Sequence, residues 1–66
     1  METDVIQILR TKTTADNQLV LVNGYLVCKF MWFYNEDSID LQPIKNITIL
    51  NVHRKNWHRI ELINQH

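Results

Sequence analysis

The stretch LVLVNGYLVCKFMWFY, residues 19–34, decides the fold, because it places two β-rich runs around an Asn-Gly pair. Asn23-Gly24 is a strong signal for a hairpin turn, since both residues tolerate a positive φ angle. The segments 18–22 and 25–34 on either side are rich in β-branched, aromatic and other apolar side chains. We therefore predict an antiparallel hairpin with strands at 18–22 and 25–34.

The same run does not satisfy the requirements of a membrane-spanning helix. Such a helix needs about 20 continuous apolar residues. The run at 19–34 is shorter and is interrupted by Lys29 and by the Asn-Gly turn. We expect no membrane partner.

Side-chain alternation predicts which face of the long strand is buried. Residues with the same parity lie on one face of a strand. One face carries Leu26, Cys28, Phe30, Trp32 and Tyr34, most of which we expect in the core. Met31 and Phe33 lie on the opposite face.

Residues 4–12 carry the signals of a short amphipathic helix. Asp4 can cap its start, and Gln7 stands three residues on as the partner in a capping box. An apolar stripe follows at i, i+3 and i+4 spacing, formed by Val5, Ile8 and Leu9. About two helical turns are unstable alone in water, so we expect the stripe to dock on the sheet.

Three further strands are predicted after the polar turn at 35–37. In the strand at 38–42, Ile39 and Leu41 alternate with polar residues, and Pro43 ends it because proline has no N–H for the ladder. The last two strands are expected at 46–52 and 57–63, joined by a short basic loop.

The whole chain, residues 1–66, therefore forms a single domain: a short helix followed by five antiparallel strands in meander order. Five such strands, one of them long and bent, usually curl into a small open barrel, so the predicted class is mostly β. An open barrel leaves two unpaired edges, which can pair with another chain and, repeated in a closed rotation, form a ring.

Composition points to self-association in a reducing compartment. A chain of 66 residues with 45% hydrophobic residues is small for a stable core, and Cys28 is the single cysteine, so disulfides cannot supplement it. One free cysteine and no signal peptide predict a cytoplasmic protein. Seven basic and seven acidic residues give zero net charge, so an overall basic footprint for nucleic acid is missing.

In its order of elements the chain resembles the Sm-like family of small SH3-like barrels, and most closely its bacterial branch, the Hfq RNA chaperones. The residues that carry the resemblance are Leu9-Arg10 in the helix, LVNG at 21–24, Tyr34-Asn35 after the long strand, Leu41, and His53. From Asn23 to His53 the spacing agrees without a gap with some Gram-positive members. The resemblance spans about residues 4–63.

The resemblance implies a homo-oligomeric ring, a hexamer in the bacterial branch, that binds single-stranded RNA as a post-transcriptional regulator. The positions matching the family's adenine-rich RNA face are Val20, Gly24, Tyr25, Leu26, Val27 and Cys28. His53, with Arg54 and Lys55 beside it, matches the pore side, and Arg10 and Lys12 match the basic rim.

Four positions depart from the family pattern. Lys29 stands where the family has the glycine that lets the second strand bend. Asp37 replaces an aromatic of the uridine pocket, and Asn51 and Val52 replace its Tyr-Lys pair. An alternative function of a different class is therefore a barrel that has lost RNA binding and acts as a protein-interaction module, through a strand edge or the basic loop.

Two local features have two readings each. Tyr25 offers a surface for base stacking, or it covers the core beside the docked helix. The segment HRKNWHR at 53–59 suits contacts to phosphate and base through its cations and Trp57, or it is a solvated charged loop.

We expect no metal, no cofactor and no catalysis. The histidines His53 and His58 with Cys28 match no tetrahedral zinc spacing and lack a fourth ligand. The single glycine rules out a glycine-rich phosphate loop, and there is no nucleophile elbow. The sequence thus predicts a binding protein without a small-molecule substrate.

Overall fold

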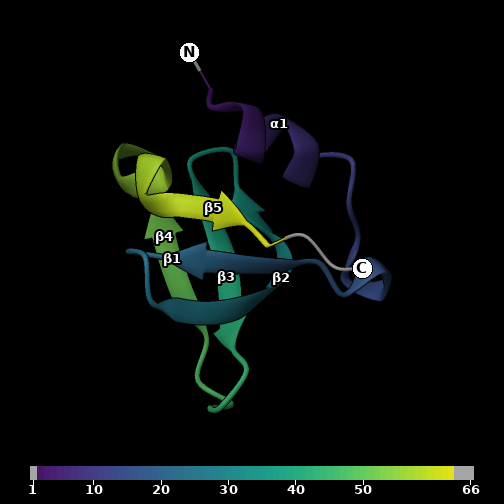
Figure 1. Cartoon of the computed structure of the whole chain (residues 1–66). Coiled ribbons are helices and arrows are strands. Elements are labelled where there is room, and N and C mark those ends of the chain that lie inside the picture. Colours follow the sequence, from purple (N-terminus) through teal and green to yellow (C-terminus); the bar gives the residue numbers. More distant parts are fainter. Residues whose placement is uncertain (1, 64–66) are drawn as a thin grey trace.

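The computed structural model describes residues 2–63 and shows a five-stranded antiparallel sheet with a short N-terminal helix (Figure 1). The strands are β1 (Leu19–Val22), β2 (Leu26–Asn35), β3 (Ser38–Pro43), β4 (Leu50–His53) and β5 (Ile60–Leu62). The helical segments are α1 (Asp4–Leu9) and two 3-10 helices, η1 (Thr14–Asp16) and η2 (Arg54–Arg59). The predicted class is confirmed: the protein is mostly β, with a short helix ahead of five antiparallel strands.

The strand order is β4-β3-β2-β1-β5, so only the first four strands form a meander. The prediction of a full meander is wrong for the last strand, because β5 pairs with β1 through Val20↔Leu62 and Val22↔Ile60. The helical segment η2 carries the chain from β4 to β5, which lies beside β1 in Figure 1. The sheet is not closed into a barrel: among residues 2–63, no ladder joins β4 to β5.

The Asn-Gly hairpin forms as the sequence predicts. β1 and β2 pair from Leu19↔Lys29 to Val22↔Leu26. Asn23 has φ 56° and Gly24 has φ 79°, the positive values that a tight hairpin turn of right-handed twist requires.

The N-terminal helix differs from its prediction in extent and in the face that it buries. Thr3, not Asp4, is the N-cap, and its Oγ1 accepts from the N–H of Ile6 at 3.3 Å. The helix ends at Leu9 rather than at 12, because Thr11 donates its N–H and its hydroxyl to the carbonyl of Ile8. Ile6 and Leu9 are fully buried, whereas Ile8, expected in the stripe, is exposed.

A β-bulge in β2 corrects the predicted core face. Cys28 and Phe30 are buried as expected, but Trp32 is 48% exposed and Tyr34 is 68% exposed. The register passes from Phe30↔Leu41 to Trp32↔Asp40, so Met31 is an extra residue on this strand. A bulge bends its strand and increases the local twist. It therefore supplies the bend without a glycine at position 29.

Beyond the bulge, alternate side chains change faces. Phe33 packs against the core, with its ring edge-on to Phe30 at 5.7 Å and to Trp57 at 6.1 Å between centroids. Trp32 lies on the other face and donates its indole N–H to Asp40 at 2.9 Å. Asp40 also accepts from the amide of Asn51, which explains how a buried carboxylate is accommodated there.

The predicted strand at 46–52 is wrong in its first half, because β4 begins at Leu50. The N–H of Asn46 donates to Pro43, and its side-chain oxygen accepts from both the N–H and the hydroxyl of Thr48. These local bonds replace ladder bonds, which is how Asn side chains compete with strands. The β3–β4 loop, residues 44–49, extends from the sheet at the end opposite α1 (Figure 1).

The predicted strand at 57–63 is also shortened, to Ile60–Leu62. The preceding residues form η2 instead of a basic loop, and His53 caps it by accepting the N–H of Lys55 at Nδ1. Trp57 is buried and donates its indole N–H to the carbonyl of Val52 at 3.0 Å. This burial holds η2 against the core.

One apolar core connects the sheet, α1 and η2. Its buried members are Ile6, Leu9, Val20, Val22, Cys28, Phe30, Ile39, Leu41, Val52, Trp57 and Ile60. The inward positions predicted for Ile39 and Leu41 are confirmed. In the described part of the chain, no helix is long and apolar enough to span a membrane.

Candidate functional site

The most exposed aromatic ring stands at the start of β2, beside an open hollow. Tyr25 follows the hairpin turn directly and is 76% exposed. Half-buried Leu26 and Val27 continue from it, and Ile44 lies against them through a hydrogen bond from its N–H to the carbonyl of Val27. Together with Pro43 and Lys45, these residues line a hollow of about 290 Å³. We call this surface the Tyr25 face.

The structure thus brings together three of the predicted adenine-face residues, Tyr25, Leu26 and Val27, with exposed Gly24 at the turn beside them. Cys28 and Val20 do not belong to this surface, because both side chains are completely buried. Burial raises the pKa of the Cys28 thiol, which disfavours the reactive thiolate. Cys28 is a core residue, so we remove it from the candidate RNA surface.

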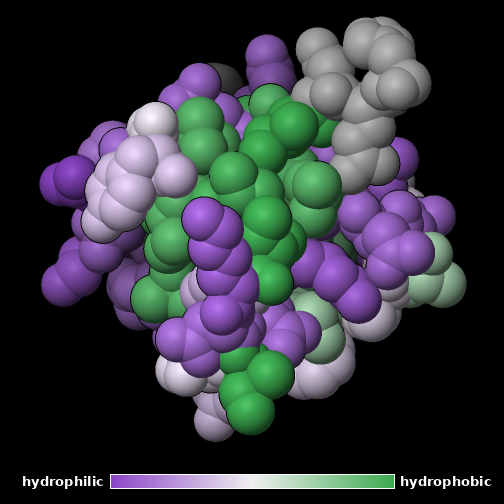
Figure 2. Space-filling model, turned by 60° about the horizontal axis from the view of Figure 1, so that its bottom comes forward, coloured by the Kyte–Doolittle hydropathy of each residue, from purple (hydrophilic) through white to green (hydrophobic). Residues whose placement is uncertain are grey.

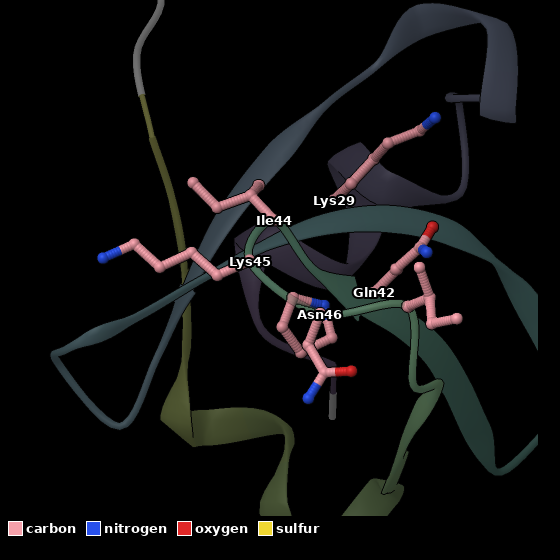
Figure 3. Close-up of a pocket in the computed structure, with 7 residues that line it drawn as sticks. Lys29, Gln42, Ile44, Lys45 and Asn46 are labelled. Carbon is pink, nitrogen blue, oxygen red and sulfur yellow. The ribbon is translucent and has the colours of Figure 1, made fainter.

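A second, larger hollow adjoins the first and was missed by sequence reasoning. It measures about 680 Å³ and is lined by Lys29, Gln42 and residues 43–47 (Figure 3). In the view of Figure 3, the Lys29 and Lys45 side chains extend in different directions, with Ile44 between them. The two hollows share Pro43, Ile44 and Lys45, so they form one continuous face.

The isoleucines that follow Pro43 are the sequence signal for this second hollow, but their spacing also fits the strand predicted at 46–52. After Pro43, isoleucines alternate with polar residues at positions 44, 47 and 49. In a strand, part of this pattern would be buried, but in the observed loop all three isoleucines are exposed.

The predicted pore-side residues lie on a different part of the molecule, at the junction of β4 and η2. His53 is engaged as the cap of η2, and Lys55 is exposed. Arg54 pairs with Asp37 at 3.0 Å and also donates to the carbonyl of Glu36. Asp37 therefore engages Arg54 in an ion pair within the chain.

The predicted stacking role of Trp57 is wrong, because its ring belongs to the core. Arg54 lies over this ring at 4.8 Å from its centroid, and Arg10 lies over Phe33 at 4.5 Å. Arg10, which the resemblance placed at a basic rim, also pairs with Glu2, and this hydrogen bond lowers the pKa of the Glu2 carboxyl and raises that of Arg10. Arg10 is therefore largely committed within the chain, whereas Lys12 makes no ion pair among the described residues.

Residues 2–63 contain no group of three or more His, Cys, Asp or Glu side chains suited to hold a metal ion. In these residues, every buried side-chain nitrogen or oxygen has a hydrogen-bond partner. The Tyr25 face and its adjoining hollow are suited to binding by stacking, apolar contact and positive charge.

No family model, curated protein or solved structure matches this chain.

Proposed function

We propose that this protein is an Sm-like RNA-binding protein whose Tyr25 face binds single-stranded RNA. The observation that carries the proposal is the exposed Tyr25 ring beside an apolar hollow with Lys45 at its border. An exposed aromatic ring stacks any base and contributes about 1–3 kcal/mol per base where such stacking occurs. The Lys45 ammonium group supplies a positive charge for the adjacent phosphate.

We further propose that copies assemble into a ring by pairing β4 of one copy with β5 of the next. The outer edges of both strands lack a partner strand within residues 2–63, and such edges readily pair with another chain. A ring, hexameric as the family resemblance implies, repeats the Tyr25 face once per copy. Weak single contacts then add up through multivalency on one RNA strand.

In this proposal the protein acts in the cytoplasm as a non-catalytic RNA chaperone and post-transcriptional regulator. It needs no metal and no cofactor, because stacking and charge neutralisation supply the binding energy. The free, buried thiol of Cys28 suits a reducing compartment.

The test is the affinity for fluorescent oligo-A and oligo-U RNA, measured by anisotropy at low salt. We expect Tyr25→Ala to weaken binding of a short oligo-A that spans the face of one copy about five- to 150-fold, the equivalent of one stacked base, and to weaken binding of longer oligo-A by more, because every copy loses its ring. Tyr34→Ala is the matched control, since Tyr34 is similarly exposed but lies at the other end of β2, and it leaves binding unchanged. Lys45→Ala lowers the slope of log affinity against log salt by about 0.7.

Native mass spectrometry of the same samples tests the assembly. A ring that binds neither RNA at low salt would refute the RNA proposal. A strictly monomeric protein at micromolar concentration would refute the proposed pairing of β4 with β5.

A further inference from the structure

We propose that the β3–β4 loop and the adjoining part of β2 form a docking site for an acidic peptide segment with apolar side chains, presented by another protein. The site is the larger hollow, lined by Lys29, Gln42 and residues 43–47. This interaction is a second activity and does not depend on RNA binding.

The first argument is the exposure of aliphatic side chains on one loop. Ile47 is 89% exposed, Ile44 is 58% exposed and Ile49 is 44% exposed. Figure 2 shows apolar side chains gathered on the face that comes forward from the bottom of Figure 1, where this loop lies. Contiguous exposed apolar surface of this kind marks interaction sites. Branched aliphatic side chains fit apolar peptide side chains better than bases, whose binding relies on flat aromatic rings.

The second argument is charge. Lys29 and Lys45 border the hollow, and neither makes an ion pair within residues 2–63. No carboxylate lines either hollow of this face. By contrast, Arg10 and Arg54 are paired with Glu2 and Asp37. A complementary ligand therefore carries carboxylates on both sides of an apolar side chain.

The third argument is that the loop is fixed before a ligand arrives. Asn46 holds Thr48 by two hydrogen bonds of 2.9 and 2.8 Å, which encloses Ile47 in a tight turn and leaves its side chain in solvent. The N–H of Ile44 is bonded to β2 through the carbonyl of Val27. A binding loop that is already ordered loses less conformational entropy on association.

The concave shape favours a peptide over an anionic membrane. A hollow of about 680 Å³ accepts one or two inserted side chains, which a peptide can offer and a bilayer surface cannot. Lysines and isoleucines on a convex tip alone would have suited a membrane equally well.

The experiment is selection of binders from a displayed library of random short peptides, using the intact protein. We expect enriched sequences to combine Leu, Ile or Phe with flanking Asp or Glu. An enriched peptide is then synthesised with a fluorophore and titrated by anisotropy. The double variant Lys29→Glu with Lys45→Glu should bind it at least about tenfold more weakly, and binding should weaken with added salt.

Matched controls separate the site from general effects of charge and hydrophobicity. Lys12→Glu with Lys55→Glu makes the same change of charge outside the hollow and should leave the affinity within about twofold. Ile47→Ser should weaken binding about tenfold, whereas Ile8→Ser, on exposed Ile8 of α1, should not. All these side chains are partly or fully exposed, and circular dichroism verifies that each variant is folded.

Three outcomes would overturn the proposal. The first is a selection that enriches nothing above a control without protein, or enriches peptides lacking acids. The second is an enriched peptide whose affinity is unchanged in the Lys29, Lys45 double variant. The third is recruitment to phosphatidylserine vesicles that depends on these lysines while no peptide is enriched.

Discussion

The two tryptophans offer a sharp test of the fold. Alternation along the long strand placed Trp32 with the core face, and the basic segment 53–59 offered Trp57 for stacking, but the structure exposes Trp32 and buries Trp57. Trp57 is 3% exposed and donates to Val52, whereas Trp32 is 48% exposed and donates to Asp40. Replacing each by phenylalanine keeps a ring and removes the indole N–H. Each variant keeps one indole, and the two remaining indoles should differ in their exposure to solvent.

The cost at Trp57 follows from three contacts. The substitution removes the indole donor from the Val52 carbonyl, whose ladder partner is Ile39, and the loss of one such hydrogen bond costs about 0.5–1.5 kcal/mol. The smaller ring leaves a void worth about 1 kcal/mol and weakens the contact with Arg54 by a few tenths. We expect Trp57→Phe to lower the free energy of unfolding by about 2–3 kcal/mol, and the midpoint of thermal unfolding by roughly 10–25 °C. At Trp32 the Asp40 carboxylate keeps its bond from Asn51 but loses the one from the indole, and a hydrogen bond to a charged acceptor contributes about 1.5–3 kcal/mol, so the two substitutions should destabilise the protein to a similar extent.

The assay combines urea unfolding with fluorescence of the same two variants. In Trp32→Phe the remaining indole is Trp57, which should emit at short wavelength and resist quenching by iodide. In Trp57→Phe the remaining indole is Trp32, which should emit at longer wavelength and be quenched readily. A Trp57 that iodide quenches like an exposed indole would refute the packing of η2, and a Trp32 that resists quenching would refute the bulge at Met31.

Three further predictions concern local chemistry. The hydrogen bond from Arg10 lowers the pKa of Glu2, so this pair stabilises the fold above the ordinary carboxyl pKa of 4.5, and the stabilisation is lost as the pH falls through the lowered pKa. The difference in thermal midpoint between wild type and Glu2→Gln should therefore vanish in acid. A difference that does not change with pH would contradict the pairing. Buried Cys28 should react with a thiol reagent only when the chain unfolds, so labelling should follow the urea transition, and rapid labelling of the native protein would contradict its burial. Gly24→Ala meets no neighbour within 4 Å but keeps φ at 79°, so it should cost about 1 kcal/mol in urea unfolding, and an unchanged stability would show that the turn relaxes.

The parts of the fold that could be predicted from the sequence depend on local chemistry. The hairpin at Asn23-Gly24 is specified by two neighbouring residues, and its strands follow directly. The faces of Trp32 and Phe33 could not be predicted, because one extra residue at Met31 inverts the alternation that follows it, and the register shifts again between Phe33 and Asn35. No residue pattern in the sequence predicts that bulge.

The last third of the chain was harder for the same physical reason. The side chain of Asn46 accepts the N–H of Thr48, and the side chain of His53 accepts the N–H of Lys55. These local hydrogen bonds compete with the ladder bonds of a strand. Trp57 stands among basic residues, which suggested an exposed ring. In the structure Trp57 is buried and attaches η2 to the core. Local hydrophobicity alone does not reveal such packing.

The candidate site divides in the same way. Tyr25, Leu26 and Val27 became candidates through the family resemblance, which matches their positions to an RNA-binding face. Lys29 and Gln42 meet residues 43–47 only through the register of β2 with β3, in which Cys28 lies opposite Pro43. That register is a property of the folded sheet, so the larger hollow was found only in the structure.

The central claim is that the Tyr25 face binds single-stranded RNA. Its most direct test is mapping of backbone amide chemical shifts by NMR as oligo-A RNA is added to the isotope-labelled protein. We predict that the largest changes cluster at Tyr25, Leu26, Val27 and Lys45, while the amides of Tyr34 and η2 remain in place. Changes confined to residues 53–59, or no changes at saturating RNA and low salt, would contradict the claim.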